Sequence, residues 1–333
     1  MCGMRVFLTG ASGYIGTAVL DAFARAGHQV TGLVRNSEKA AEVAARGGLP
    51  LIGDLHDPAS YRQAAVWNDL FIHAGFDGAR PVETDRRAIE TLIAAARAGR
   101  AIRPSVLIYT SGIWVLGPTP TPAAEDAPLN PTPIVTFRPA HEQLVLSAAG
   151  DGLRTAVVRP GLVYGGSRGI VGDLFRHAVN GVIRIIGTGE NRWPTVYDRD
   201  LAELYLLLAR SENASGVFHA NNESDERVNE IVEAIVAHVS PTPDVRRVPL
   251  EEAQARLGPY ALALALDQVV RSPRAHALGW APELKSFAGN AARLFGEWRA
   301  DSAAREQEAT SGPPKPDRPA ATRTRRRARP AGE

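Results

Sequence analysis

Residues 5–16 read RVFLTGASGYIG, an apolar run of strand character that breaks into three spaced glycines where a helical pattern begins. In a turn of this kind Gly10 lets the backbone turn sharply, Gly13 lets it approach a pyrophosphate, and Gly16 lets the helix pack closely on the strand. The N–H groups that open the helix then face the phosphates. Apolar residues recur at helical spacing over 14–26. The stretch therefore predicts a dinucleotide-binding turn.

A second strand is predicted at 28–34, and the residue after it bears on the choice of dinucleotide. An acidic residue there accepts hydrogen bonds from a ribose 2′-hydroxyl, whereas a guanidinium offers charge and a donor fork to a 2′-phosphate. This chain has Arg35, followed by Asn36 and Ser37. NADP(H) is therefore favoured. NAD(H) stays possible, because the alternative interpretation of Arg35 is a solvated side chain at a strand end.

Strands and helices alternate through the first half of the chain. This order is typical of a parallel sheet covered by helices on both faces. We therefore predict an α/β fold of the Rossmann type, a doubly wound parallel sheet with a smaller C-terminal substrate lobe. The further predicted strands are 51–53, 70–73, 106–109 and 155–158, the helices are 88–98, 139–149 and 173–180, and a Pro/Thr-rich surface excursion is expected at 118–133.

A length of 333 residues suits a dinucleotide-binding domain with a smaller lobe. We assign 1–165 to the Rossmann domain, with core strands also contributed by later segments, 166–300 to a mixed α/β substrate lobe, and 301–333 to a disordered basic Pro/Arg-rich tail.

Residues 312–333 hold seven Lys/Arg against two acids, so a net charge of +2 for the whole chain leaves about −3 for the remainder. The body lacks a nucleic-acid-binding signature, and RTRRRAR at 323–329 is expected to be a solvated tail, with contact to acidic surfaces as the alternative.

The single cysteine, Cys2, excludes an internal disulfide and a thiol-based metal site. The eight histidines never fall at i, i+4 spacing with a third ligand nearby, so no metal site is predicted. The apolar start is too short for a signal peptide or a membrane helix. We expect a cytoplasmic protein with no membrane partner.

Seven motifs occur in order along the chain: TGASGYIG at 9–16, GDL at 53–55, a strand running into Ala74-Gly75, YTSG at 109–112, RPGLVYG at 159–165, VYDRDLA at 196–202 and LGWAP at 278–282. Their order and spacing resemble the extended short-chain dehydrogenase/reductase family, in its NAD-dependent epimerase/dehydratase group. The resemblance covers nearly the whole folded chain. It implies a nicotinamide cofactor and a small-molecule substrate, and it makes a homodimer reasonable.

The resemblance also implies roles for residues along the cofactor. Asp54 and Leu55 would flank the adenine, Ala74 and Gly75 would line the middle of the cofactor, and a segment after the sixth strand would pass beside the nicotinamide. Asp54 has a second interpretation, because a short polar side chain after a strand often caps the following turn. The full expected set is Gly10, Gly13, Tyr14, Ile15, Gly16, Arg35, Asp54, Leu55, Ala74, Gly75, Pro160, Gly161, Leu162 and Val163.

The catalytic region departs from the family pattern. Such enzymes usually pair Ser/Thr with a Tyr-x-x-x-Lys motif, in which the lysine and the cofactor lower the tyrosine pKa so that the phenol exchanges a proton with the substrate. Ser111 is in place, but Ile134 falls at the tyrosine position and Arg138 at the lysine position, and Asp85 replaces the helix asparagine. Isoleucine has no proton to give, and arginine stays protonated throughout the working range.

The proton is predicted to come from Tyr164, because its loop should approach the nicotinamide, or from water. Tyr109, Tyr197 and His141 are the alternatives, and each also has an ordinary packing role. Ser111 follows a strand without a G-x-S-x-G elbow, which disfavours hydrolysis. Catalytic roles are thus expected for Ser111, Arg138 and Tyr164.

Two functions follow from these residues. The first is an NADP(H)-dependent oxidoreductase that acts on a small carbonyl or an activated alkene. The second is a catalytically weak NADP(H)-binding sensor or partner-binding protein, which the replacements at Ile134 and Arg138 favour. Ser111 and a substrate-sized lobe favour the enzyme.

Overall fold

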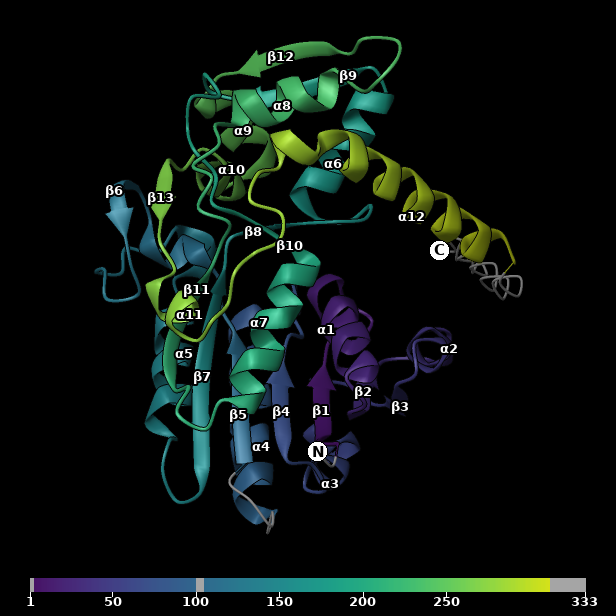
Figure 1. Cartoon of the computed structure of the whole chain (residues 1–333), viewed down its shortest axis with the longest axis vertical. Helices are drawn as coiled ribbons and strands as arrows, with labels where there is room; N and C mark the ends of the chain where they lie inside the picture. The colour runs from purple at the N-terminus through teal and green to yellow at the C-terminus, as the bar shows by residue number, and fades with distance from the viewer. Residues whose placement is uncertain (1–2, 100–104, 312–333) are drawn as a thin grey trace, which may run out of the picture.

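The computed structural model describes residues 3–99 and 105–311 and contains one seven-stranded parallel sheet (Figure 1). The strand order β11-β7-β5-β4-β1-β2-β3 reverses direction beside β1, so the predicted doubly wound Rossmann topology is confirmed. The sheet strands are β1 (Arg5–Thr9), β2 (Gln29–Val34), β3 (Leu49–Ile52), β4 (Leu70–His73), β5 (Ser105–Thr110), β7 (Leu153–Pro160) and β11 (Gly216–Ala220).

Both faces of the sheet are buried beneath helices. In β1, Val6 and Leu8 belong to an apolar cluster that includes Leu201 and Leu204, whereas Phe7 points into a cluster with Leu92 on the other face. Figure 1 shows α1 and α7 together on the first face. The helices of this domain are α1 (Tyr14–Arg25), α2 (Ser37–Ala45), α3 (Arg62–Ala65), α4 (Pro81–Ala98), α5 (Arg138–Ser147) and α7 (Asp198–Arg210).

Helix α4 begins at Pro81 rather than at the predicted residue 88, because proline suits the first position of a helix. The excursion at 118–133 is also more than a surface loop. It contains β6 (Thr119–Ala123), which pairs with β13 (Gln268–Val270) from the far end of the chain.

A second apolar cluster forms the C-terminal lobe, which lies beyond the carboxyl ends of the sheet strands (Figure 1). Residues 198–220 return to the Rossmann domain as α7 and β11, as expected for core strands supplied by later segments. The other elements are β8 (Leu162–Tyr164), α6 (Gly169–Val179), β9 (Val182–Ile186), β10 (Thr195–Tyr197), α8 (Val228–Val236), β12 (Asp244–Val248), α9 (Leu250–Leu257), α10 (Tyr260–Leu264), α11 (Pro273–Ala277) and α12 (Ala291–Ser311).

The predicted tail boundary at 301 is wrong, because α12 continues to Ser311. Asp301 accepts hydrogen bonds from the Ser167 N–H at 2.8 Å and from its hydroxyl at 2.5 Å, and the Trp298 indole N–H donates to the Gly172 carbonyl at 3.0 Å. These contacts hold the helix on the lobe as far as the predicted boundary at Asp301. The rest of the predicted tail, 312–333, lies outside the described residues. Within 3–99 and 105–311, no helix is long and apolar enough to cross a membrane.

Candidate active site

The glycine turn leaves no room for side chains. Gly10 has a φ of +69°, and a Cβ there would lie 2.6 Å from the Ala74 carbonyl oxygen. A Cβ at Gly16 would lie 2.0 Å from the Gly10 carbonyl oxygen, and one at Gly13 would lie 2.8 Å from it. The Gly13 N–H donates to that same carbonyl at 2.7 Å. Each glycine is therefore required by the close approach of main chain to main chain.

Helix α1 begins directly after this turn without a side-chain cap. Its N-cap residue is Gly13, which has no side chain to accept a hydrogen bond from the first turn of the helix. Tyr14 and Ile15, the first two helical residues, line a cleft. A turn with bare main chain and an uncapped helix N-terminus fits the pyrophosphate of a dinucleotide.

This cleft has a volume of about 480 Å³ and brings together segments far apart in the sequence. The predicted residues that line it are Tyr14, Ile15, Ser111, Arg138, Pro160, Gly161, Leu162 and Val163. Ile134 also lines it, from a 3₁₀ turn at Pro133–Val135. The parallel sheet and the lobe therefore meet at the point where cofactor and substrate are expected.

The predicted adenine-end residues lie outside this cleft. Asp54 accepts a hydrogen bond from the His56 N–H at 2.9 Å, so it has the turn-capping role. Its contact with adenine stays a prediction, as does that of Leu55, whose side chain adjoins Gly75. Arg35 is exposed directly after β2 and forms no ion pair with another residue of the described chain.

The expectation that Tyr164 donates a proton is not supported by its position. Its side chain is fully buried in the apolar cluster of the lobe, and its hydroxyl donates to the Leu284 carbonyl at 3.3 Å. Burial raises the pKa of Tyr164 far above its usual value. The residue packs between Tyr197 and Phe287 rather than facing the cleft, whereas Leu162 and Val163 of the same short strand β8 line the cleft.

The alternative donors are also held away from the cleft. The Tyr197 hydroxyl donates to Glu297 at 3.0 Å on another side of the lobe. Tyr109 and His141 are buried and both contact Asp85. Of the aromatic hydroxyls weighed as surrogates, none lines the described cleft.

Ser111 belongs to a buried chain of charged and polar groups. Its hydroxyl donates to the Glu142 carboxylate, which pairs with Arg159 at 2.6 Å, and Arg159 lies 3.4 Å from the His219 ring nitrogen Nε2. Glu142, Arg159 and His219 are each at most 3 % exposed. Burial, and secondly the charge of Arg159, lower the pKa of His219 to about 3. The histidine is thus neutral at pH 7, and the pair beside it is held in one geometry.

Arg138 is held by a second buried network centred on Asp85. The Asp85 carboxylate accepts from the Tyr109 hydroxyl at 2.6 Å and contacts His141 at 2.7 Å and His73 at 3.1 Å. Burial acts to raise the pKa of Asp85, but the hydrogen bonds of the two histidines outweigh it and hold that pKa below its usual value. An ionised carboxylate therefore sits beneath the site.

The Arg138 guanidinium joins this network at its cleft end. It donates to the Tyr109 hydroxyl at 3.1 Å and to the Thr110 carbonyl at 2.8 Å. It also lies 5.8 Å from the centre of the exposed Phe76 ring. Arg138 therefore places a fixed positive charge at the wall of the cleft. Ile134, which lines the same cleft, carries no charge.

Sequence reasoning missed several residues of the site. Glu142 was not among the predicted site residues, although a glutamate four residues after Arg138 lies on the same helix face. Arg168 donates to the Ser12 carbonyl of the glycine turn at 2.9 Å, and nothing in its local sequence indicates this. Trp114 and Tyr260 also line the cleft, and their ring centres lie 6.0 Å apart in an edge-to-face arrangement.

Comparison with known proteins agrees with this geometry. Residues 6–222 match the model of the NAD dependent epimerase/dehydratase family, and the chain belongs to that family. It is 34 % identical over 288 residues to the uncharacterized protein C2A9.02 of Schizosaccharomyces pombe, covering 84 % of this chain and 95 % of that protein. It is 30 % identical over 266 residues to a 2-alkyl-3-oxoalkanoate reductase of Stenotrophomonas maltophilia, covering 70 % and 76 %.

Among solved structures, a complex of Thermus thermophilus UDP-glucose 4-epimerase with NAD has a TM-score of 0.75. The two chains are 22 % identical, and the match covers 89 % of this chain and 99 % of the other. At that identity the likeness shows the shared fold.

We predict that Gly13→Val abolishes binding of NADPH and NADH, because the added side chain collides with the Gly10 carbonyl and fills the turn. Calorimetric titration of the folded variant measures this. Gly296→Val is the matched control, since a Cβ there meets nothing within 4 Å. Unchanged affinity in Gly13→Val would contradict the binding turn.

A second prediction concerns acid stability. The unfolded chain protonates His219 below about pH 6.5, while the folded chain does not until about pH 3. Stability from this group is therefore complete above pH 6.5 and declines as the pH falls, by about 2 kcal/mol between pH 7.5 and 5.0. Urea unfolding should show this decline in the wild type and a shallower one in His219→Gln. The exposed His238→Gln is the control, and equal slopes in all three proteins would refute the assignment.

Proposed function

We propose that the chain is an NADP(H)-dependent oxidoreductase that acts on a small carbonyl or an activated alkene. The observation that carries this proposal is the single cleft in which the start of α1, the Ser111 hydroxyl and the Arg138 guanidinium meet. The similarity to a 2-alkyl-3-oxoalkanoate reductase supports a carbonyl over an alkene.

A nicotinamide dinucleotide supplies the hydride when it is bound. Its pyrophosphate would rest on the turn at Gly10, Gly13 and Gly16, and Pro160–Val163 would border its reactive end. Arg138 orients the ribose and adds positive charge beside the carbonyl oxygen, which favours the build-up of negative charge there. Arg138 keeps its own proton, so it positions and polarises but does not transfer a proton.

Ser111 contacts the substrate oxygen in this proposal. Its hydroxyl donates to Glu142, so its oxygen offers lone pairs to the cleft and can accept from a substrate alcohol. Rotation away from Glu142 makes it a donor to a substrate carbonyl. Because Ile134 and Tyr164 supply no proton, the proton that completes the alcohol comes from water, and turnover of carbonyls should be slow.

The preference for NADP(H) rests on Arg35. The Thermus epimerase is solved with NAD, so the fold does not itself require the 2′-phosphate of NADP(H). The residue after β2 would then determine which of the two dinucleotides is preferred. Arg35 is exposed and forms no ion pair with another described residue, which leaves its guanidinium for a 2′-phosphate.

A second candidate function is a cofactor-binding sensor with little chemistry. Ile134 at the cleft wall favours it, because the group that normally donates the proton is replaced by an alkyl chain. Tight NADPH binding without turnover, together with ligand-dependent association with a partner, distinguishes this candidate.

For either function we also propose a cytoplasmic location and a homodimer.

The enzyme proposal predicts stoichiometric oxidation of NADPH with at least one member of a panel of 3-oxo esters, ketones and aldehydes. Ser111→Ala should lower kcat/KM by about a hundredfold, because a group at the substrate oxygen is lost. Ser147→Ala, at the exposed end of α5, should leave kcat/KM unchanged. Failure of the wild type to oxidise NADPH with every member would leave the sensor as the function.

The cofactor preference predicts that Arg35→Ala weakens NADPH binding by about tenfold and NADH binding little, since only NADPH carries the 2′-phosphate. Calorimetry on both nucleotides gives the ratio. Arg62→Ala, an exposed arginine on α3, controls for the change in net charge. An unchanged ratio removes the argument for NADP(H).

A further inference from the structure

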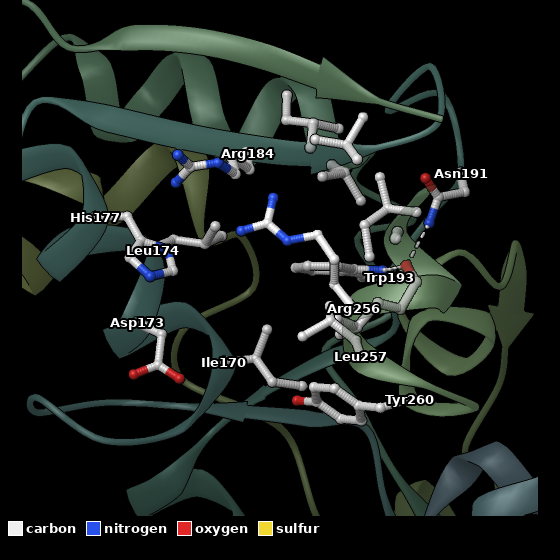
Figure 2. Close-up of a pocket in the computed structure, with 16 residues that line it drawn as sticks. Ile170, Asp173, Leu174, His177, Arg184, Asn191, Trp193, Arg256, Leu257 and Tyr260 are labelled. Carbon is white, nitrogen blue, oxygen red and sulfur yellow. Dashed lines mark hydrogen bonds between the residues drawn. The ribbon is translucent and has the colours of Figure 1, made fainter. Parts of the chain in front are cut away.

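A second pocket lies in the C-terminal lobe, bounded by α6, β9, α9 and α10, and its volume is about 390 Å³ (Figure 2). Its walls are mostly apolar and include Leu174, Ile185, Trp193, Val228 and Leu264. This size suits a small organic group. Two polar groups in the walls are already engaged, because the Trp193 indole N–H and the Asn191 amide both donate to the Leu264 carbonyl, at 3.0 and 3.1 Å.

The pocket adjoins the cleft that holds Ser111. Ile170 and Tyr260 line both spaces, so the two spaces adjoin at these side chains. In Figure 2 these two residues lie at the same end of the pocket, away from Arg184. The shared wall residues are an isoleucine and an aromatic ring, which suit an aliphatic chain at the junction.

Two arginines give the opposite part of the pocket a positive charge. Figure 2 shows the side chains of Arg184 and Arg256 extending into the same space. Arg184 has no ion pair with any residue in the described part of the chain, and Arg256 has only a loose one, 3.9 Å from Glu252 on its own helix. The carboxylate of Asp173, which also lines the pocket, is paired with Arg176. The two guanidinium groups therefore lack a close counter-charge.

We propose that this pocket binds the body of an elongated substrate, an aliphatic chain that ends in a carboxylate or phosphate beside Arg184 and Arg256. The reacting carbonyl of the same molecule then lies in the cleft at Ser111. This inference rests on the proposed function, because it takes the cleft as the reacting end. It adds the class of substrate: an oxo compound with an apolar body and a distal anion.

Calorimetric titration of the NADPH-loaded wild type with octanoate, octyl phosphate and octanol tests the inference without turnover. At least one of the two anions should bind about tenfold more tightly than octanol, and the comparison between them tells carboxylate from phosphate. The anion's affinity should fall as NaCl rises from 20 to 300 mM, while that of octanol should not, because salt screens the arginines.

Arg184→Gln combined with Arg256→Gln should remove this preference, so that the anion binds no better than octanol. Arg247→Gln is the matched control, because this exposed arginine lies on β12 and lines a different hollow of the lobe. Equal binding of octanol and both anions, or an unchanged preference in the double variant, would overturn the inference. The charged residues are exposed, so folding is not at risk, and the salt series gives a second measurement on the wild type.

The outcome is separable from that of the proposed function. Arginine-dependent anion binding in a protein that oxidises no NADPH supports the pocket and refutes the reaction. If the rate of NADPH oxidation does not depend on a distal anion on the substrate, in the wild type or in the double variant, the reaction is supported and the anion-binding pocket is refuted.

Discussion

The close approach of main chain to main chain at the glycine turn is the constraint on which the rest of this structure depends. Gly10 lies against the carbonyl of Ala74, and Gly16 lies against the carbonyl of Gly10, at separations that exclude any Cβ. The turn therefore brings the start of α1 over the ends of β1 and β4. The helix N-terminus and the residues after β4 meet at one edge of the sheet for that reason, and the cleft forms above them.

Two buried ionic networks then set the positions of the groups in the cleft. Glu142 and Arg159 hold Ser111 from one side, and Asp85 with its two histidines holds Tyr109 and Arg138 from the other. Buried charges are costly unless they are paired and hydrogen-bonded, and these are. These networks lie at the site, where fixed side chains are needed, and they give the Arg138 guanidinium a defined orientation.

The lobe supplies what the Rossmann domain lacks. Its apolar cluster buries Tyr164 and Tyr197, and a pocket lined by two arginines adjoins the cleft at Ile170 and Tyr260. The site thus has a polar end at Ser111 and Arg138, an apolar middle and a cationic end. This arrangement favours recognition by length and charge over recognition by many hydrogen bonds.

The sequence alone was sufficient for the fold and for the position of the glycine turn. The glycine spacing, the alternation of strands and helices, and the order of the family motifs are local patterns, and local backbone sterics and hydrophobic periodicity determine what they form. The roles of Tyr164, Glu142 and Asp85 were decided only by the tertiary structure. Whether a tyrosine faces a cleft or a core, and which charges meet in the interior, depends on how separate segments of the chain pack together, as Tyr164 and Leu284 do across 120 residues. The packing of α12 as far as Asp301 has the same origin, because its contacts with Ser167 and Gly172 come from a distant loop and helix.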